Sequence, residues 1–132
     1  MIVIDASAVL ELLLNTPPGA RVARRIAPED ETLHAPHVLD LEVAQVLRRY
    51  ALARLIDDSR AQQALDDLHD LGIERYPHDV LLPRIWQLRH NVTAYDAAYL
   101  ALAETLTATL ITFDGRLASV PGVIARVEVM DA

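Results

Sequence analysis

Lysine and cysteine are both absent from the 132 residues, and the 12 basic side chains are all arginine. Without cysteine the chain has no disulfide, no thiolate metal site and no cysteine nucleophile. Without lysine it has neither the P-loop side chain that reaches a nucleotide phosphate nor an amine for Schiff-base chemistry. Only four glycines occur, and no two are spaced for a G-x-G-x-x-G dinucleotide motif. These absences exclude several large enzyme classes.

The remaining composition is that of one folded, acidic domain. Hydrophobic residues make up 52% of the chain, and the mean hydropathy of +0.19 excludes disorder. The length predicts a single domain over residues 1–132. The net charge of −7 argues against a generally basic, polyanion-binding surface. Asp5 follows the first four residues with no positive region, and Glu11 interrupts the apolar stretch 6–14. We therefore expect no signal peptide, no membrane span and a soluble cytoplasmic protein.

Short β-type runs alternate with helical patterns along the whole chain. The predicted strands are Met1–Ile4, Thr32–Ala35, Ile73–Tyr76, Thr109–Phe113 and Val127–Met130. The predicted helices cover 6–14, 20–27, 36–54, 57–72, 79–90 and 93–106, with Pro36 as the first residue of the third. This alternation predicts an α/β fold, a parallel sheet with helices on both faces.

Two aspartates directly follow predicted strands. Asp5 comes after Ile2–Ile4, and Asp114 comes after Leu110–Phe113. Ligands of open parallel sheets bind at the carboxyl ends of the strands, so both carboxylates are candidate site residues. Each also has a purely structural interpretation, because Asp5 could cap the next helix and Asp114 could form a turn with Gly115.

Two further acids lie on predicted helices. Glu42 falls inside the apolar arc of its helix, where a charge needs a partner; Arg49, two turns further on, is the structural alternative. Asp96 ends a Thr93–Asp96 capping-box pattern, which could explain it without any function. The helix that follows is almost wholly apolar, so we expect it to be buried with Asp96 at its inner end.

Four converging carboxylates would raise one another's pKa values, and a divalent cation would relieve that repulsion. Mg²⁺ and Mn²⁺ prefer carboxylate and water oxygens. Zinc is the weaker choice because cysteine is absent and the histidines lack paired ligand spacing. We interpret His34 and His37, which lie on either side of Pro36, as structural or solvent-facing.

Four segments together resemble the PIN domain, in particular the small toxin ribonucleases of the VapBC toxin–antitoxin class. Met1–Ala8 resembles the opening strand with its first acid and a following hydroxyl residue. Leu41–Val43 lies in the helix that supplies the family's glutamate, and Tyr95–Ala103 is similar to its most recognisable helix. Leu110–Asp114 resembles the late strand, where threonine stands two places before aspartate. The likeness spans the chain in order.

The resemblance implies a three-layer α/β/α fold and RNA cleavage that depends on Mg²⁺ or Mn²⁺. It implies that Asp5 and Asp96 are the main metal ligands and that Glu42 and Asp114 complete the catalytic site. Ser7 and Thr112 would support them by hydrogen bonding. It also implies a homodimer and a cognate antitoxin that covers the site. The metal would then generate the attacking water and offset charge on the phosphate.

An RNA substrate would need local positive charge. Arg48, Arg49, Arg89 and Arg116 adjoin the acidic motifs and are the candidate RNA-binding residues, although a solvated face or an ion pair explains each one singly. Leu12–Leu14 and Trp86 are candidate interface residues, with core packing as the alternative. The sequence leaves open whether the RNA is transfer, ribosomal or messenger RNA.

Other classes share an acidic α/β layout. A signalling receiver domain also binds Mg²⁺ but uses a lysine, which this chain lacks. Haloacid-dehalogenase-type phosphatases need that lysine too, together with a D-x-D motif that Asp5-Ala6-Ser7 does not provide. The remaining alternative is a non-catalytic PIN-like interaction module, against which the presence of all four acids argues.

Overall fold

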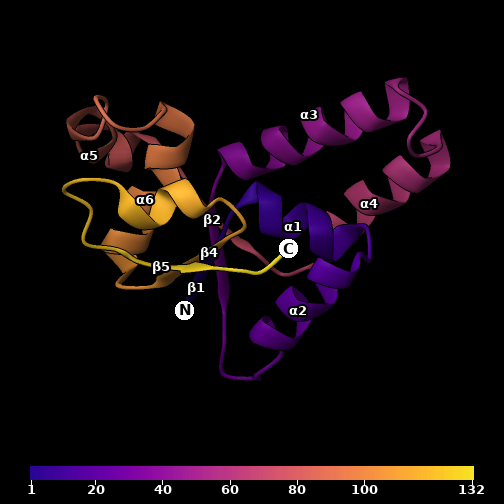
Figure 1. Ribbon diagram of the computed structural model, residues 1–132, viewed down its shortest axis with the longest axis horizontal. Coiled ribbons are helices and arrows are strands. Elements are labelled where there is room, and N and C mark those ends of the chain that lie inside the picture. The colour runs from indigo at the N-terminus through magenta and orange to yellow at the C-terminus, as the bar shows by residue number, and fades with distance from the viewer.

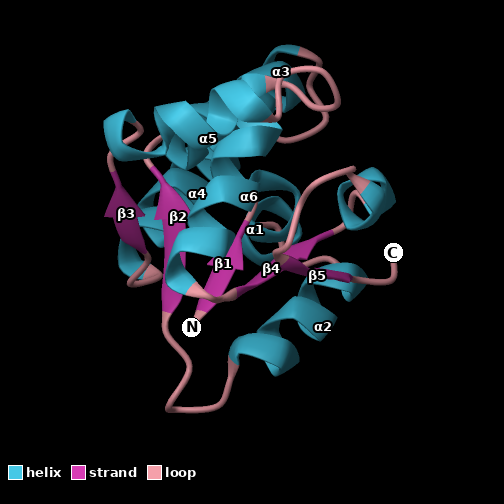
Figure 2. Cartoon of the chain, turned by 90° about the vertical axis from the view of Figure 1, so that its left-hand side faces the viewer, coloured by secondary structure: helices cyan, strands magenta, loops and turns pink.

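Five short parallel strands form the centre of the protein. The computed structural model describes residues 1–132, and its strands are β1 (Ile2–Ile4), β2 (Leu33–Pro36), β3 (Glu74–Tyr76), β4 (Thr109–Thr112) and β5 (Arg126–Val129). They lie in the order β3-β2-β1-β4-β5, and every neighbouring pair is parallel (Figure 2). All three residues of β1 are buried, as expected for the central strand of a sheet covered on both faces.

The strand order explains why the helices form two layers. From β1 the chain moves outward to β2 and β3, then returns to the other side of β1 for β4 and β5. Right-handed crossovers place the helices of these two halves on opposite faces. Figure 1 shows α5 and α6 on one side of the sheet and the first four helices on the other, which confirms the predicted three-layer α/β/α fold. The helices are α1 (Ala6–Leu13), α2 (Pro17–Ile26), α3 (Val38–Leu52), α4 (Asp58–Asp70), α5 (Leu82–Gln87) and α6 (Ala94–Leu106), with 3₁₀ turns η1 (Asp79–Leu81) and η2 (Gly115–Ser119).

The hydrophobic core lies between the sheet and both helical layers. All seven residues Ala97–Ala103 of α6 are buried, which confirms the expectation for this apolar helix. The four alanines of this buried segment let α6 lie close to β1, β2 and β4. Leu13 is also buried, and Leu12 and Leu14 are partly buried and pack against the core, which fits core packing, the alternative interpretation of this run. Trp86, in contrast, is 67% exposed.

The prediction that Pro36 opens a helix is wrong. Pro36 ends β2, where it pairs with Tyr76, and the next N–H, that of His37, donates to the Tyr76 carbonyl over 2.9 Å. This pairing with β3 keeps the chain extended, and α3 begins only at Val38. The side chain of His78 caps that helix, because its Nε2 accepts the N–H of Val38 at 2.9 Å.

Prolines explain two further differences from the prediction. Helix α2 begins at Pro17 and not at residue 20, because a proline in the first turn forfeits no intrahelical bond and Thr16 caps the helix. The predicted helix 79–90 is divided into η1 and a short α5. Pro83 has no N–H for an α-helical bond to Asp79, so the chain makes a 3₁₀ turn before α5 begins.

No helix of the structure is both long enough and apolar enough to cross a bilayer.

Candidate active site

The four acids lie where the chain changes direction in the sheet. β1 and β4 are neighbours, with Ile4 beside Ile111, but the connections leaving them run toward opposite edges. Such a switch point opens a crevice at the carboxyl ends of the two strands. Asp5 follows β1 there, and Asp114 follows β4. Glu42 comes from α3 in one helical layer, and Asp96 from the first turn of α6 in the other.

Asp5 is the buried centre of a hydrogen-bond network. Its Oδ1 accepts the Ser7 hydroxyl at 2.6 Å and the Ala8 N–H at 3.1 Å, and its Oδ2 accepts the Thr112 hydroxyl. The predicted N-cap role is therefore real, because Asp5 caps α1. Capping leaves part of the hydrogen-bonding capacity of the carboxylate free. Three bonds occupy three of about four lone-pair sites, and the remaining one is on Oδ2.

The two supporting hydroxyls can point in only one direction. Ser7 Oγ accepts the Phe113 N–H at 3.0 Å, and Thr112 Oγ1 accepts the Asp114 N–H at 2.9 Å. Each hydroxyl proton is therefore directed at Asp5, and the network favours the carboxylate form of that side chain. Burial works in the opposite direction and is the larger effect, so the pKa of Asp5 is raised despite these bonds; the charge of Asp96 adds to the increase.

Glu42 has a partner that the sequence analysis did not identify. The Tyr99 hydroxyl donates to Glu42 Oε1 over 2.6 Å, and Arg49, the structural alternative, forms no ion pair with it. Burial raises the pKa of Glu42, and the charges of Asp96 and Asp5 raise it further. The pKa of Tyr99 is also raised by burial and by the Glu42 charge, so its hydroxyl keeps the donated proton. The available signal was a single hydroxyl, that of Tyr99, within the otherwise apolar segment Ala97–Ala103.

Asp96 forms only half of the predicted capping box. The Thr93 hydroxyl accepts the Asp96 N–H at 3.2 Å, but no return bond runs from the Asp96 carboxylate to the Thr93 N–H. Helix capping thus accounts for Thr93 and leaves the carboxylate of Asp96 available. Burial raises the pKa of Asp96, and the charge of Asp114 raises it further.

Asp114 lies at the exposed side of the site and is held by Arg116. The Arg116 Nη2 is 2.6 Å from Asp114 Oδ2, and its Nε is 3.0 Å from Oδ1. Asp114 also caps η2 by accepting the Arg116 N–H. These bonds lower the pKa of Asp114. Of the four acids, this one alone forms an ion pair, and the Arg116 charge also acts to lower the pKa of Asp96.

The donor set suits a hard divalent ion that keeps part of its water shell. Charge repulsion links Asp96 with each of the other three acids, so the four carboxylates share one field. No three histidine, aspartate or glutamate side chains lie close enough together to hold a metal ion by themselves. Mg²⁺ is commonly held by only one or two carboxylates together with waters and substrate phosphates, which fits this looser arrangement.

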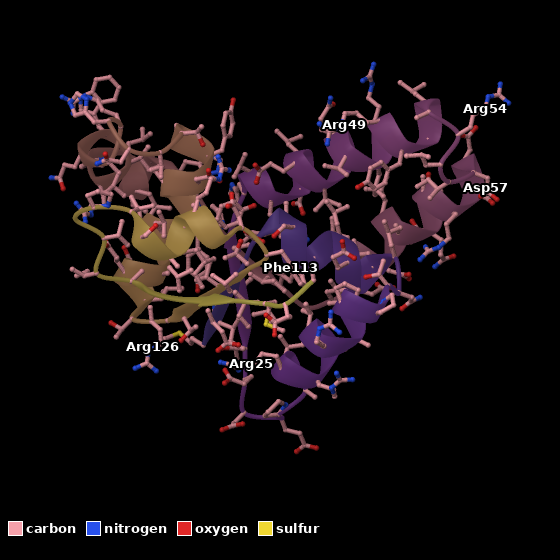
Figure 3. The ribbon with its side chains drawn as sticks, viewed as in Figure 1. Arg25, Arg49, Arg54, Asp57, Phe113 and Arg126 are labelled. Carbon is pink, nitrogen blue, oxygen red and sulfur yellow. The ribbon has the colours of Figure 1, made fainter.

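The predicted RNA-binding arginines fall into two groups. Arg48 and Arg49 are exposed on α3 and make no side-chain hydrogen bond or ion pair. Figure 3 shows Arg49 on the outer side of α3 and Phe113 between the two helical layers. Arg89 lies over the Trp86 ring at 4.7 Å, and Arg116 is paired with Asp114.

The histidines do not contribute to this site. His34 is buried in β2, between the Thr32 hydroxyl and the Tyr76 hydroxyl, each 2.7 Å away. His37 ends the β2–α3 connection and lies edge-on to His78. As expected, His34 is structural, and His37 is exposed to solvent.

Comparison with known proteins identifies the family. The PIN domain model matches residues 2–123. The chain belongs to the PIN-domain family. It is 44% identical over 129 residues to Ribonuclease VapC1 of Mycobacterium tuberculosis, covering 97% of this chain and 96% of that protein. It is also 44% identical to Ribonuclease VapC12 of the same species over 130 residues, covering 98% and 99%.

Solved structures share the PIN fold. PAE2754 from Pyrobaculum aerophilum superposes with a TM-score of 0.71 at 25% identity, covering 97% of this chain and 83% of that one. VapC20 of M. tuberculosis, described as a sarcin-ricin loop cleaving toxin, gives 0.69 at 16% identity, covering 96% and 99%. VapBC2 from Rickettsia felis, bound to promoter DNA, gives 0.69 at 14% identity, covering 99% and 100%. These two likenesses concern the fold of the PIN domain alone.

Proposed function

We propose that this PIN domain is a metal-dependent endoribonuclease and the toxin of a type II toxin–antitoxin system. The observation that carries the proposal is the meeting of Asp5, Glu42, Asp96 and Asp114 at the β1–β4 switch point. The full-length likeness to proteins named Ribonuclease VapC supports it. A signalling receiver would require a lysine that the chain lacks.

The acids would bind Mg²⁺ or Mn²⁺ and accept a proton from the attacking water. Asp5 and Asp96 are the proposed main ligands, with Glu42 and Asp114 completing the site directly or through water. A bound divalent ion would lower the pKa of water and offset charge on the scissile phosphate. Ser7 and Thr112 keep the Asp5 carboxylate in one orientation. Glu42 Oε2 carries no hydrogen bond and is free to accept a proton from water.

Helix α3 carries two of the proposed RNA-binding residues. Arg49 is seven residues from Glu42, so both lie on the same face of the helix, about 10 Å apart along its axis at 1.5 Å per residue. Arg49 and its neighbour Arg48 have no acidic partner, which leaves their guanidinium groups free for phosphate oxygens. An RNA strand cut beside Glu42 would therefore pass over Arg49, and Arg48 lies about 100° around the helix from it. Arg116 could reach the same strand by leaving Asp114.

An apolar surface indicates where two copies would meet. Leu82, Trp86 and Tyr95 are each more than half exposed, beside a 140 Å³ apolar pocket lined by Val38 and Ile85 among others. A protruding tryptophan and a pocket on one face are suited to a two-fold dimer, in which each copy offers both. We expect Trp86→Ser to shift sedimentation from dimer to monomer. Ile124→Ser, at an exposed position elsewhere, should leave the dimer intact.

A cognate antitoxin is the other proposed partner, and it would cover the acidic edge. The full-length likeness to proteins named VapC supports such a pair. A short adjacent reading frame whose product binds this chain and stops cleavage would establish the antitoxin. A chain that cleaves equally well with and without that product would contradict this part of the proposal.

The central experiment is RNA cleavage with Mg²⁺ or Mn²⁺. Asp96→Asn keeps the side-chain shape and removes one ligand charge, and Asp5→Ala removes the buried ligand. Both should lower cleavage at least about a hundredfold, since metal-borne stabilisation contributes several kcal/mol. Asp30→Asn, at an exposed position with no side-chain bond, is the matched control. Folded variants that cleave like wild type would refute the proposed site, and cleavage by none of the proteins would favour a non-catalytic PIN module.

A further inference from the structure

Tyr99 is the one polar side chain in the buried segment Ala97–Ala103 of α6. It is only 2% exposed, and phenylalanine would satisfy the packing of its ring equally well. Its hydroxyl makes a single hydrogen bond, to Glu42 Oε1 at 2.6 Å. No other group donates to the Glu42 carboxylate. The chain thus places one buried hydroxyl against one acid of the proposed site.

This bond connects the two helical layers across the end of the sheet. Glu42 belongs to α3, and Tyr99 belongs to α6, which lies on the opposite face (Figure 1). Tyr99 is three residues after Asp96, so both side chains are on the same side of α6. The position of Glu42 relative to Asp96 is therefore set through Tyr99.

The bond also selects which oxygen of Glu42 remains available. Oε1 is occupied by the hydroxyl, whereas Oε2 has no partner. A glutamate has three rotatable side-chain torsions, and without a donor its carboxylate would exchange among several rotamers. A hydrogen bond to a charged acceptor is strong enough to favour one of them.

We propose that Tyr99 is a positioning residue that holds Glu42 for metal binding, an inference that rests on the function proposed above. Tyr99 is buried and acts only through Glu42. It occupies Oε1 and leaves Oε2, the oxygen without a partner, for the metal. The helix that carries Asp96 thereby orients a second acid of the site.

Tyr99→Phe tests this role because it removes only the hydroxyl. Tyr76→Phe is the matched control: Tyr76 lies on the edge strand β3, and the variant also removes one hydroxyl bond, over 2.7 Å to His34 on β2. Three measurements apply to each protein: Mn²⁺ affinity by calorimetry, kcat and KM for RNA, and the side-chain couplings of Glu42 by NMR without metal. Loss of a residue that orients a ligand costs about 10–100-fold in metal affinity or activity.

For Tyr99→Phe we expect roughly tenfold weaker Mn²⁺ binding and a similar fall in kcat, the low end of that range, with KM within about twofold. The Glu42 couplings should change from a single rotamer to an average. Tyr76→Phe should match wild type in all three. In the background of Glu42→Gln, Tyr99→Phe should have almost no additional effect, because the tyrosine acts through that carboxylate.

Three results would overturn the positioning role: wild-type Mn²⁺ affinity in Tyr99→Phe, a single Glu42 rotamer in that variant, or equal losses in Tyr76→Phe. A wild-type protein that neither binds Mn²⁺ nor cleaves RNA would refute the proposed function instead. The metal-free NMR comparison then still tests whether Tyr99 fixes Glu42, so the two failures are distinguishable.

Discussion

The buried hydroxyl of Thr112 should contribute more to stability and activity than its size indicates. Thr112 is fully buried, and Thr112→Val keeps its shape while removing two hydrogen bonds. The bond donated to Asp5 is to a charged group, worth about 1.5–3 kcal/mol. The Asp114 N–H also loses its acceptor, at a cost of about 1 kcal/mol where water can partly replace it. The expected loss in unfolding free energy is about 3 kcal/mol.

That loss converts into a measurable change in melting temperature. Unfolding entropy near 2.1 cal/mol/K per residue gives about 0.28 kcal/mol/K for 132 residues, so 3 kcal/mol lowers Tm by about 10 °C. Thr112→Ser is the matched variant, since it keeps the hydroxyl and loses only a buried methyl, at about 1 kcal/mol or 4 °C. Urea unfolding and calorimetry would measure both variants, and RNA cleavage should fall about 10–100-fold in the valine variant only.

The pH dependence of the stability difference between Thr112→Val and Thr112→Ser tests whether the bond to Asp5 causes it. The Thr112 hydroxyl lowers the pKa of Asp5, against the larger raising effect of burial, so the valine variant should have the higher folded-state pKa. The stability gap is then full while Asp5 is ionised and shrinks as pH falls through the two Asp5 pKa values. A valine variant as stable as the serine variant above those values would refute the reasoning.

Two other positions give independent tests of the fold. Gly19→Ala should cost about 1–3 kcal/mol, or about 4–11 °C in Tm, because an added Cβ would lie 2.0 Å from the Glu11 carbonyl oxygen in α1. Gly115→Ala meets no atom within 4 Å and should melt like wild type; equal losses in both would show that the helix contact is not the cause. Burial lowers the pKa of His34, with the Glu74 charge opposing, so the folded protein binds this proton less readily than the unfolded chain. Stability should be lost as pH falls below about 6.5, where the unfolded histidine takes up its proton, and His34→Gln should reduce that slope in urea titrations at pH 8 and pH 5. An unchanged slope would contradict the assignment.

The sequence predicted best those features that follow directly from strand geometry. Short β-type runs between helical patterns predicted all five strands to within a residue or two, and parallel strands bring their carboxyl ends to one edge. Asp5 and Asp114 therefore could be placed from their positions after strands. The prediction that Glu42 and Asp96 join these two acids depended on their positions on apolar helices and on the resemblance to the PIN domain.

What could not be predicted depends on contacts between distant residues. Pro36 is typical of a helix start, but pairing with β3 extends the strand through it. Arg49 was a plausible partner for Glu42 by local spacing, yet a buried hydroxyl 57 residues away takes that place. The pairing of Arg116 with Asp114 is local, but a sequence does not show which rotamer an exposed arginine adopts.

The hydrogen-bond network around Asp5 determines when, during synthesis of the chain, the proposed site can form. Asp5 and Thr112 are 107 positions apart in sequence, and β1 lacks one of its two neighbours until β4 has been made. A ribosome making this chain therefore carries a nascent polypeptide in which Asp5 has no donor from the late strand. Assembly of the centre waits until nearly all of the domain has been synthesised. An enzyme able to cut RNA would thus remain inert toward the message and the ribosome during its own synthesis, which gives a bound inhibitor time to be in place when the fold closes.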